Sequence, residues 1–377
     1  MKNTITAYWR KISKRLFGSI TLHPQGVKPR GRVLISYILE PFLLLPHEKL
    51  STRHSNYFEC KTIVEYFLNK GYIVQVIDAR NSAFIPKKKY SYVLDIGHNL
   101  ERFKPYLKEA VTIHHATTSY WKFNNTAEFL RLSAFKQRNG EYLKPQRGLP
   151  ESKNFEIADF VFGFGNEHTV NTFPESNKIT LLPQSLPAIF YLPKRDWNEA
   201  QHHFLWLSGG GAVHKGLDLL LEIFRSHPDL LLHICGPVKA EKDFVSFYRK
   251  ELFETPNIIY HGRVDIESEK FKEIHTKCGF IIYPSCSEGQ SGAVLVAMST
   301  GLIPIISKET GVTIGNKGYI LQKSFIKDIE EALKWTRKLT PITLEDMSKK
   351  VYTKTTDTYG QKQFATALKE YFDAIVQ

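Results

Sequence analysis

Residues 283–312, YPSCSEGQSGAVLVAMSTGLIPIISKETGV, contain the pattern that decides the fold. An apolar stretch, 279–283, leads into a polar turn with two glycines, 285–292, and then into a second apolar stretch, 293–300. The first stretch has the length and composition of a buried strand, and the last has those of a short helix. The turn is therefore predicted to lie at the carboxyl end of a strand and the amino end of a helix.

Such a turn is suited to bind an anion. The first N–H groups of a helix have no partner within it, and the helix dipole places partial positive charge at the same end. We expect Ser291 to be the N-cap of this helix and Gly301 to end it. Glu288 could accept hydrogen bonds from the hydroxyl groups of a ligand whose phosphates lie on the amides. An ordinary strand-to-helix turn with an exposed glutamate would explain the same residues.

The size and charge of the chain limit the possible classes of protein. Its 377 residues favour two domains of about 100–200 residues each. Lys and Arg number 51 against 38 acidic residues, so the formal charge of +13 predicts anionic partners such as phosphates, nucleic acid or a membrane surface. Nucleic-acid binding is disfavoured, because the sequence contains no known nucleic-acid motif and no stripe of interleaved aromatic and basic residues.

The spacing of the cysteines and the hydropathy of the sequence indicate the cellular compartment of the protein. The four cysteines lie far apart, without a CxxC pair or zinc-type spacing: Cys60, Cys235, Cys278 and Cys286. A reducing cytoplasmic compartment is the simplest interpretation. The sequence has no run of about 18 apolar residues, and its start lacks the features of a signal peptide, so we expect neither a transmembrane helix nor a cleaved leader.

Residues 1–20 (MKNTITAYWRKISKRLFGSI) are predicted to form a basic amphipathic helix. Apolar side chains recur at helical spacing, at Ile5, Tyr8, Trp9, Ile12 and Leu16, and Lys and Arg fill much of the rest. A helix of this kind can lie on an anionic bilayer. It could equally pack on its own domain. The first interpretation places the protein peripherally on the inner face of the membrane.

Strand and helix patterns alternate along both halves of the chain. In the first half we expect strands at 33–38, 72–77, 92–96, 111–114, 160–164 and 179–182, with helices at 53–69, 130–143 and 167–173. In the second half we expect strands at 204–207, 231–235, 258–260, 280–283 and 303–306, with a helix at 216–225. This alternation predicts parallel, doubly wound sheets.

The fold class predicted is therefore α/β with two Rossmann-like domains and a cleft between them. The expected division is an N-terminal segment at 1–30, a first domain at 31–193 and a second domain at 202–359. The polar residues 194–203 (KRDWNEAQHH) are predicted to be the linker. The last helix, at 361–375, has no strand to follow, and residues 360–377 are expected to pack back on the first domain.

The second half resembles the donor-binding domain of family-four glycosyltransferases, which are retaining enzymes with the GT-B fold. Besides 283–312, the similar stretches are HKGLDLLLEIF (214–224), LHICGP (232–237) and NIIYHGRV (257–264). The first half is more weakly similar, through IADFVFGFGNEHTV (157–170) and LLPQSLPAIFYLP (181–193). The resemblance implies the GT-B fold, an acceptor domain followed by a donor domain, and a nucleotide-sugar donor.

The resemblance also assigns residues to the donor site. Lys215 matches a lysine that holds the donor diphosphate, whereas Gly210 stands where an arginine is expected. Glu288 matches the first glutamate of an E-x7-E motif, but the second position is Val296, so a ribose contact must come from elsewhere. The donor-binding residues expected are Gly209, Gly210, Lys215, Gly289, Gln290, Ser291, Gly292, Ala293 and Val294. Possible diphosphate or acceptor contacts are His98, Arg147 and Arg263.

A histidine from the first domain often approaches the donor sugar in the family. His114 and His115 end the strand at 111–114, and alternation sends their side chains to opposite faces. We expect His115 to face the cleft and to be catalytic together with Glu288; a buried, structural histidine is the alternative. Residues 39–51 replace the family's glycine-rich loop with a leucine-rich one, either an apolar edge for a lipid-linked acceptor or a loop packed on the core.

The function expected is therefore hexosyl transfer with retention, from a UDP- or GDP-linked sugar to a glycan or lipid-linked glycan, in surface polysaccharide or glycoconjugate synthesis. We expect no cofactor and no metal, because the sequence has no Asp-x-Asp motif and cations can neutralise the leaving diphosphate. Gly210 and Val296 also support an alternative, a catalytically impaired GT-B protein that binds a glycan or a partner protein.

Overall fold

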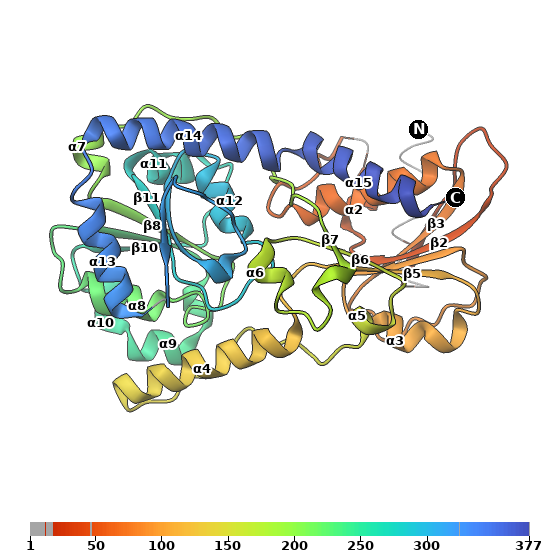
Figure 1. The fold of residues 1–377 in the computed structure, drawn as a ribbon, viewed down its shortest axis with the longest axis horizontal. Helices are drawn as coiled ribbons and strands as arrows, with labels where there is room; N and C mark the ends of the chain where they lie inside the picture. The colour runs from red at the N-terminus through yellow and green to blue at the C-terminus, as the bar shows by residue number, and fades with distance from the viewer. Residues whose placement is uncertain (1–11, 13–17, 46, 324, 377) are drawn as a thin grey trace.

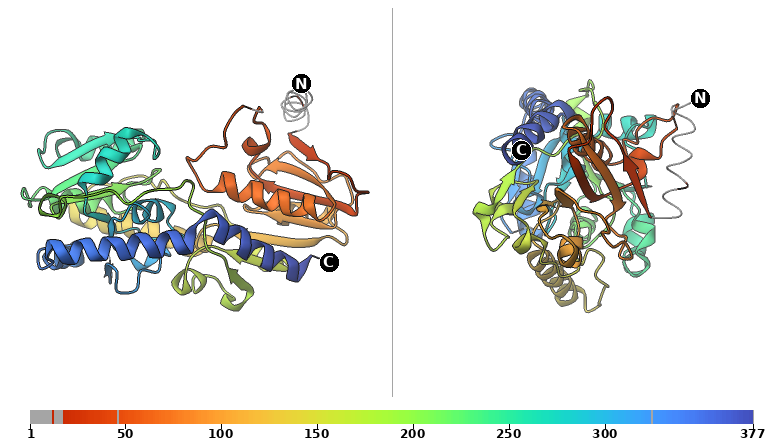
Figure 2. Two further views of the ribbon diagram at one scale, coloured as in Figure 1. Left: turned by 90° about the horizontal axis from the view of Figure 1, so that it is seen from above. Right: turned by 90° about the vertical axis from the view of Figure 1, so that its right-hand side faces the viewer.

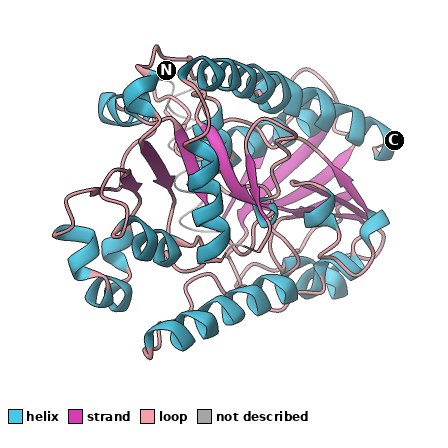
Figure 3. Cartoon of the chain, turned by 60° about the vertical axis from the view of Figure 1, so that its left-hand side comes forward, coloured by secondary structure: helices cyan, strands magenta, loops and turns pink. Residues whose placement is uncertain are grey.

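The computed structural model describes residue 12 and residues 18–45, 47–323 and 325–376. The predicted basic helix at 1–20 lies outside these residues, except for Ile12 and residues 18–20. The chain forms two α/β lobes, one built on a seven-stranded sheet and the other on a six-stranded sheet (Figure 1). Helices lie on both sides of the strands (Figure 3).

The first sheet has the strand order β1-β3-β2-β4-β5-β6-β7. Its strands are β1 (Ser19–Leu22), β2 (Gly31–Tyr37), β3 (Tyr72–Asp78), β4 (Tyr92–Asp95), β5 (Val111–Ala116), β6 (Phe160–Gly163) and β7 (Ile179–Leu181). All neighbours are parallel except β1, which pairs with β3 in antiparallel fashion. The central strands consist of continuous apolar runs, since both faces of the sheet are covered by helices. The sequence did not predict β1, whose four residues are too short to give a period.

Helices lie on both faces of this sheet. The helices of the first half of the chain are α2 (Asn56–Asn69), α3 (Asn99–Phe103), α4 (Trp121–Asn139), α5 (Asn154–Ile157) and α6 (Glu167–Val170), with 3-10 turns η1 (Glu40–Phe42), η2 (Lys104–Tyr106) and η3 (Ser176–Lys178). On one face, α2 packs beside the C-terminal helix α15 (Gln361–Ile375), which buries Phe364, Leu368 and Phe372 in the core of the first sheet. The chain thus ends on the first lobe (Figure 2).

The second sheet is parallel throughout, in the order β10-β9-β8-β11-β12-β13. Its strands are β8 (His203–Leu207), β9 (Leu231–Cys235), β10 (Ile258–Gly262), β11 (Phe280–Tyr283), β12 (Ile303–Ser307) and β13 (Tyr319–Leu321). The helices are α7 (Trp197–Ala200), α8 (Leu217–Phe224), α9 (Lys242–Phe247), α10 (Arg249–Phe253), α11 (Glu269–Lys277), α12 (Gly292–Met298), α13 (Ile326–Thr336) and α14 (Pro341–Tyr359), with turns η4 (Val238–Ala240) and η5 (Lys308–Thr310).

The predicted linker at 194–203 packs against the second domain. Arg195 donates hydrogen bonds to the carbonyl oxygens of His275, Cys278 and Thr300, at 2.7–3.0 Å. Trp197 is buried against the same domain. The segment is polar because its arginine satisfies helix-end and loop carbonyls, so polarity here marks a packed connection.

The loop after β2 packs on the core of the first domain. Leu39 and Phe42 are buried there, and η1 tightens the chain between them. Leu43 lies against the same cluster and is only partly buried. These residues therefore agree with the second interpretation of the leucine-rich stretch, a loop packed on the core.

In the parts of the chain that the structure describes, no helix combines the length and the apolar character needed to cross a membrane.

Helices tie the two lobes together. The long helix α4, drawn in yellow in Figure 1, leaves the first sheet and runs along the second lobe. Its Arg138 forms ion pairs with Asp218, at 2.7 Å, and with Glu222, at 3.1 Å. On the other side, α14 of the second lobe continues almost directly into α15 of the first.

Three histidines form a stack across neighbouring strands of the second sheet. His203 and His233 share a ring hydrogen bond of 2.9 Å, and His233 and His261 share one of 3.0 Å. Burial, reinforced by the adjacent histidines, lowers the pKa of His233 to about 3. The folded protein therefore holds His233 neutral in a pH range where the unfolded chain would protonate it.

This stack should make the protein sensitive to acid. Since the folded pKa of His233 lies below its unfolded value, its contribution to stability is complete above about pH 6.5 and is lost as pH falls toward 3. We expect His233→Gln to reduce the loss of unfolding free energy between pH 7.5 and 5.0 by about 2 kcal/mol. Urea unfolding at the two pH values measures this difference. An identical pH dependence in wild type and variant would contradict it.

Candidate functional site

Two turns at the carboxyl ends of neighbouring strands build the site. Lys215 lies in the turn after β8, and Glu288 lies in the turn after β11; the two strands are hydrogen-bonded neighbours. The Lys215 Nζ and Glu288 Oε1 atoms form an ion pair, and the side chains are only 6% and 14% exposed. The hydroxyl groups of Tyr283 and Ser285 also donate to Glu288 Oε1, at 3.4 and 3.2 Å.

The two turns are bonded to each other along their length. The backbone N–H of Cys286 donates to the carbonyl oxygen of His214, at 2.9 Å, and His214 Nε2 lies 2.8 Å from the carbonyl oxygen of Ser287. Burial, with a smaller effect of the Lys215 charge, lowers the pKa of His214 to about 3, so the neutral ring donates from Nε2. Gly216, at φ +73°, allows the close approach, since a Cβ there would meet Pro284 at 2.5 Å.

The environment of Glu288 keeps it ionised. Burial alone would raise its pKa, but the Lys215 ammonium and smaller contributions from its surroundings lower the pKa below the usual value. For Lys215, burial lowers the pKa and Glu288 partly opposes this effect. The pair is thus a carboxylate and an ammonium shielded from water, which is the form that can exchange partners with an anionic ligand.

The turn at 285–292 lies directly against the first domain. Ser287 Oγ and Ser119 Oγ share a hydrogen bond of 2.5 Å, and Thr169 Oγ1 donates to the carbonyl oxygen of Gly289 at 2.8 Å. Gly289 is required there, because a Cβ would come within 2.6 Å of the carbonyl oxygen of Thr117. The side chain of Gln290 accepts from the Gln184 N–H, at 3.2 Å. The predicted donor turn therefore faces the first domain.

The predicted N-cap of α12 is confirmed in position, because Ser291 precedes the helix in an extended conformation, although its side chain makes no capping hydrogen bond. The helix ends at Met298 with Ser299 as its C-cap, so Gly301, at φ +81°, lies one residue beyond the C′ position predicted for it. The Ser291 N–H donates to the carbonyl oxygen of Thr310. Within the first turn, Gly292 and Ala293 are partly exposed and Val294 is fully buried. Anion binding by these amides stays a prediction.

The glycine turn after β8 already holds a carboxylate. Gly209 is exposed, and Gly210 and Gly211 have φ of +132° and +83°. The N–H groups of Gly211 and Ala212 donate to the Glu241 carboxylate, at 2.7 and 3.0 Å. No sequence motif indicates Glu241, which comes from the η4–α9 connection. Val296, the second position of the glutamate motif, is a side chain buried in the core of the second domain.

The prediction that His115 faces the cleft is wrong. Its ring is fully buried and stacks on Phe162, with centroids 4.2 Å apart, and it meets the edge of Phe164 at 4.6 Å. Burial lowers its pKa well below the usual value. Strand alternation does separate the two histidines, but the face that carries His115 is covered by α2 and α15. His114 is the one that faces outward to a pocket.

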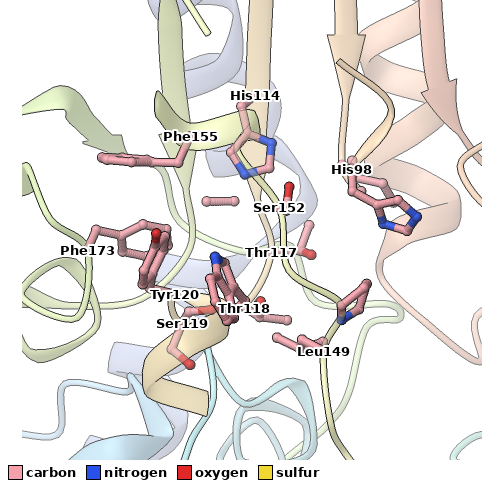
Figure 4. Close-up of a pocket in the computed structure, with 15 residues that line it drawn as sticks. His98, His114, Thr117, Thr118, Ser119, Tyr120, Leu149, Ser152, Phe155 and Phe173 are labelled. Atoms are coloured by element: carbon pink, nitrogen blue, oxygen red, sulfur yellow. Dashed lines mark hydrogen bonds between the residues drawn. The ribbon is translucent and has the colours of Figure 1, made fainter. Parts of the chain in front are cut away.

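That pocket has a volume of about 160 Å³ and lies at the carboxyl ends of β4 and β5. Its polar lining includes His98, His114, Thr117, Ser119 and Ser152, and its aromatic lining includes Tyr120, Trp121, Phe155 and Phe173. Figure 4 shows His114, Ser152 and Thr117 around the opening, with Phe155 and Phe173 on one side and His98 on the other. Ser119 connects the pocket to the Glu288 turn through its bond to Ser287.

The two arginines predicted as contacts lie in different places. Arg147 is exposed and rests on Gly211 in the turn that carries Lys215. Arg263 follows β10 and lines a separate hollow of about 370 Å³ together with Lys239 and Tyr260. The structure therefore brings Arg147, but not Arg263, to the Lys215 turn. Among the described residues, no group of three or more His, Cys, Asp or Glu side chains could hold a metal ion.

Comparison with known proteins finds a similar family for the second half of the chain. Residues 195–353 match the model of a family described as glycosyl transferases group 1. The second domain is thus similar to group 1 glycosyl transferases. Lys215 and Glu288 both lie within the match, whereas His114 and Arg147 lie outside it. The finer assignment to family four stays a prediction, and no curated protein matches the sequence.

Solved structures extend the likeness to both domains. Sucrose-phosphate synthase from Thermosynechococcus elongatus has a TM-score of 0.62 at 13% identity, over 91% of this chain and 98% of that one. Anabaena HepE, solved with UDP and glucose, gives 0.59 at 9%, over 92% and 100%. Staphylococcus aureus TarM, a variant solved with fondaparinux, α-GlcNAc-glycerol and UDP, gives 0.54 at 14%, over 78% of this chain but only 57% of TarM. The predicted GT-B fold is confirmed.

Breaking the buried ion pair should cost stability in a pH-dependent way. In Lys215→Ala, burial of Glu288 is no longer opposed, so we expect its pKa to rise and the protein to lose about 3–5 kcal/mol of unfolding free energy at pH 8. The loss should shrink at pH 5.5, where the carboxyl group becomes protonated. Urea unfolding at both pH values measures it.

The matched control for this prediction is the double variant Lys215→Met and Glu288→Gln, which removes both charges and should lose less stability than Lys215→Ala. A loss in Lys215→Ala that does not depend on pH, or a double variant as unstable as the single one, would contradict the argument.

Proposed function

We propose that this protein transfers a sugar from a nucleotide-sugar donor to a glycan acceptor. The observation that carries the proposal is the buried pair of Lys215 and Glu288, which lies in the domain similar to group 1 glycosyl transferases, where its strands end against the first domain. Neighbouring structures solved with UDP and sugars support a nucleotide-sugar donor. A ligand at this point would contact both domains.

Glycosyl transfer requires positive charge beside the leaving group. As the glycosidic bond of the donor breaks, negative charge develops on the diphosphate, and a fixed cation in a dry site stabilises it. Lys215 supplies this cation. Because Lys215 pairs with Glu288 in the free protein, donor binding exchanges a carboxylate partner for a phosphate partner. Glu288 is then released to accept hydrogen bonds from hydroxyl groups of the donor sugar.

We extend the proposal to hexosyl transfer with retention, from a UDP- or GDP-linked sugar, without a divalent metal or a cofactor. Its support is the resemblance to family-four enzymes together with the local cations. A role in surface polysaccharide or glycoconjugate synthesis, a lipid-linked acceptor and a peripheral position at the cytoplasmic face of a membrane belong to the same proposal. The formal charge of +13 and the sequence of residues 1–20 support that location.

The pocket beside His114 is the proposed site of the acceptor sugar. It combines aromatic side chains, which can pack against the apolar face of a sugar ring, with hydroxyl and imidazole groups that can bind its hydroxyl groups. A volume of about 160 Å³ suits a single small ring better than an extended oligosaccharide. The hydrogen bond shared by Ser119 and Ser287 links the pocket to the turn of the proposed donor site and so supports this assignment.

A panel of UDP- and GDP-sugars tests the donor proposal. We expect the purified full-length protein to hydrolyse at least one donor slowly without an acceptor, and to do so equally well with EDTA present. Proton NMR of the first product formed should show the anomeric configuration of the donor. If the protein neither binds nor hydrolyses any donor, the proposal is overturned. A first product with the opposite anomeric configuration would overturn retention, and loss of activity in the presence of EDTA would overturn metal independence.

The alternative function is glycan or partner binding by a catalytically impaired GT-B protein. Gly210, Val296 and the Glu241 carboxylate in the glycine turn favour it, since each removes a group that could bind the donor. Lys215→Met and Glu288→Gln distinguish the two functions. A binding module would keep its glycan or partner affinity in both variants and show no transfer in the wild type.

The acceptor pocket generates a separate prediction for His114. We expect His114→Ala to lower the rate of transfer to an acceptor by at least about tenfold, while donor hydrolysis in the absence of acceptor changes by less than about threefold. His115→Phe is the comparison variant, because a core ring replaces a core ring there. Equal losses of transfer and hydrolysis in His114→Ala would contradict an acceptor role.

A further inference from the structure

Three arginines reach the second domain from helix α4 and the loop that follows it. Arg131 donates to the carbonyl oxygen of Pro284, at 3.0 Å, and Arg138 pairs with Asp218 and Glu222. The third, Arg147, is exposed, and within the described part of the chain its guanidinium has no hydrogen bond or ion pair. Two of the three therefore hold the domains together, and Arg147 is left available for a ligand.

The backbone that carries Arg147 is held firmly. The carboxylate of Glu128 on α4 accepts from the N–H groups of Gln146 and Arg147, at 2.9 and 2.8 Å. Asn124 donates to the carbonyl oxygen of Arg147 at 2.8 Å, and Asn125 makes two bonds of 2.8 Å with the backbone of Leu149. The loop thus presents this side chain from a fixed position, which lowers the entropy cost of binding.

The stem of Arg147 lies over the turn that carries Lys215. A Cβ placed on Gly211 would come within 2.6 Å of Arg147 Cγ and 2.9 Å of Cδ, so the glycine makes room for the arginine. The charge of Arg147 reaches the ion pair. Burial is the main cause of the lowered pKa of Lys215, and Arg147 lowers it further; the same guanidinium helps to lower the pKa of Glu288.

The two carboxylates at this turn already have partners. Glu288 pairs with Lys215, and Glu241 accepts from the backbone N–H groups of Gly211 and Ala212. Within the described part of the turn, Arg147 is thus a cation without a carboxylate partner. A planar guanidinium on a firmly held backbone is well suited to bind phosphate oxygens in a bidentate manner.

We propose that Arg147 of the first domain binds the diphosphate of the nucleotide donor, beside Lys215 of the second domain. This inference rests on the proposed function. It assigns one of the phosphate contacts to a loop outside the second domain, so donor binding joins the two domains through a single ligand.

Calorimetric titration of the full-length protein with UDP and GDP, and with uridine and guanosine, tests the proposal. For the nucleotide that the wild type binds, we expect Arg147→Ala to weaken diphosphate affinity by about 10- to 100-fold and to leave nucleoside affinity within about twofold. Arg147→Lys keeps the charge but loses the bidentate geometry, so it should recover only part of the affinity. Lys136→Ala, which removes an exposed charge from α4, should bind both ligands like the wild type.

The outcomes separate the two levels of the proposal. If the wild type binds UDP or GDP and Arg147→Ala binds it equally well, the assignment of Arg147 is overturned while the proposed function stands. Equal loss of nucleoside and diphosphate affinity would also overturn the assignment, because it would show a general disturbance of the site. A wild type that binds neither diphosphate overturns both.

Discussion

The ion pair between Lys215 and Glu288 is the interaction on which the architecture of the site depends. Removing an ammonium and a carboxylate from water costs several kcal/mol for each ion, and only close pairing with additional hydrogen bonds compensates for this cost. Here the compensation comes from Tyr283 and Ser285 and from the junction of the two turns through His214. Because each partner follows a different strand, the pair exists only when β8 and β11 lie side by side.

The first domain completes this environment. Its Ser119 and Thr169 bond to the turn that holds Glu288, and Gly289 leaves no space for a side chain between the turn and Thr117. These contacts reduce the exposure of the Lys215–Glu288 ion pair to water, which strengthens the attraction between the two charges. The bond between Ser119 and Ser287 also links the His114 pocket to the turn of Glu288. The proposed donor and acceptor sites therefore share one junction of the two domains.

The sequence predicted features that depend on local pattern and missed those that depend on what covers a surface. Apolar runs located β9 and β11 to the residue, and the 361–375 helix was also correct in its bounds. Alternation separated His114 from His115, but only the packing of α2 and α15 decides which of them is buried. The polarity of 194–203 predicted a linker, but sequence alone does not show that Arg195 in it has three carbonyl partners in the second domain.

The candidate site follows the same division. The resemblance to family-four glycosyltransferases pointed to Lys215 and Glu288, whereas Glu241 and the pocket lining depend on tertiary contacts that no motif indicates. Arg147 lies 68 residues before Lys215 in the sequence and reaches its turn only through α4 and the bonds of Glu128. A ligand that binds residues of both domains favours the arrangement in which both contacts form, by as much as its affinity for that arrangement exceeds its affinity for others. If Arg147 and Lys215 bind one diphosphate, as we propose, donor binding is thereby coupled to the contact between the two domains.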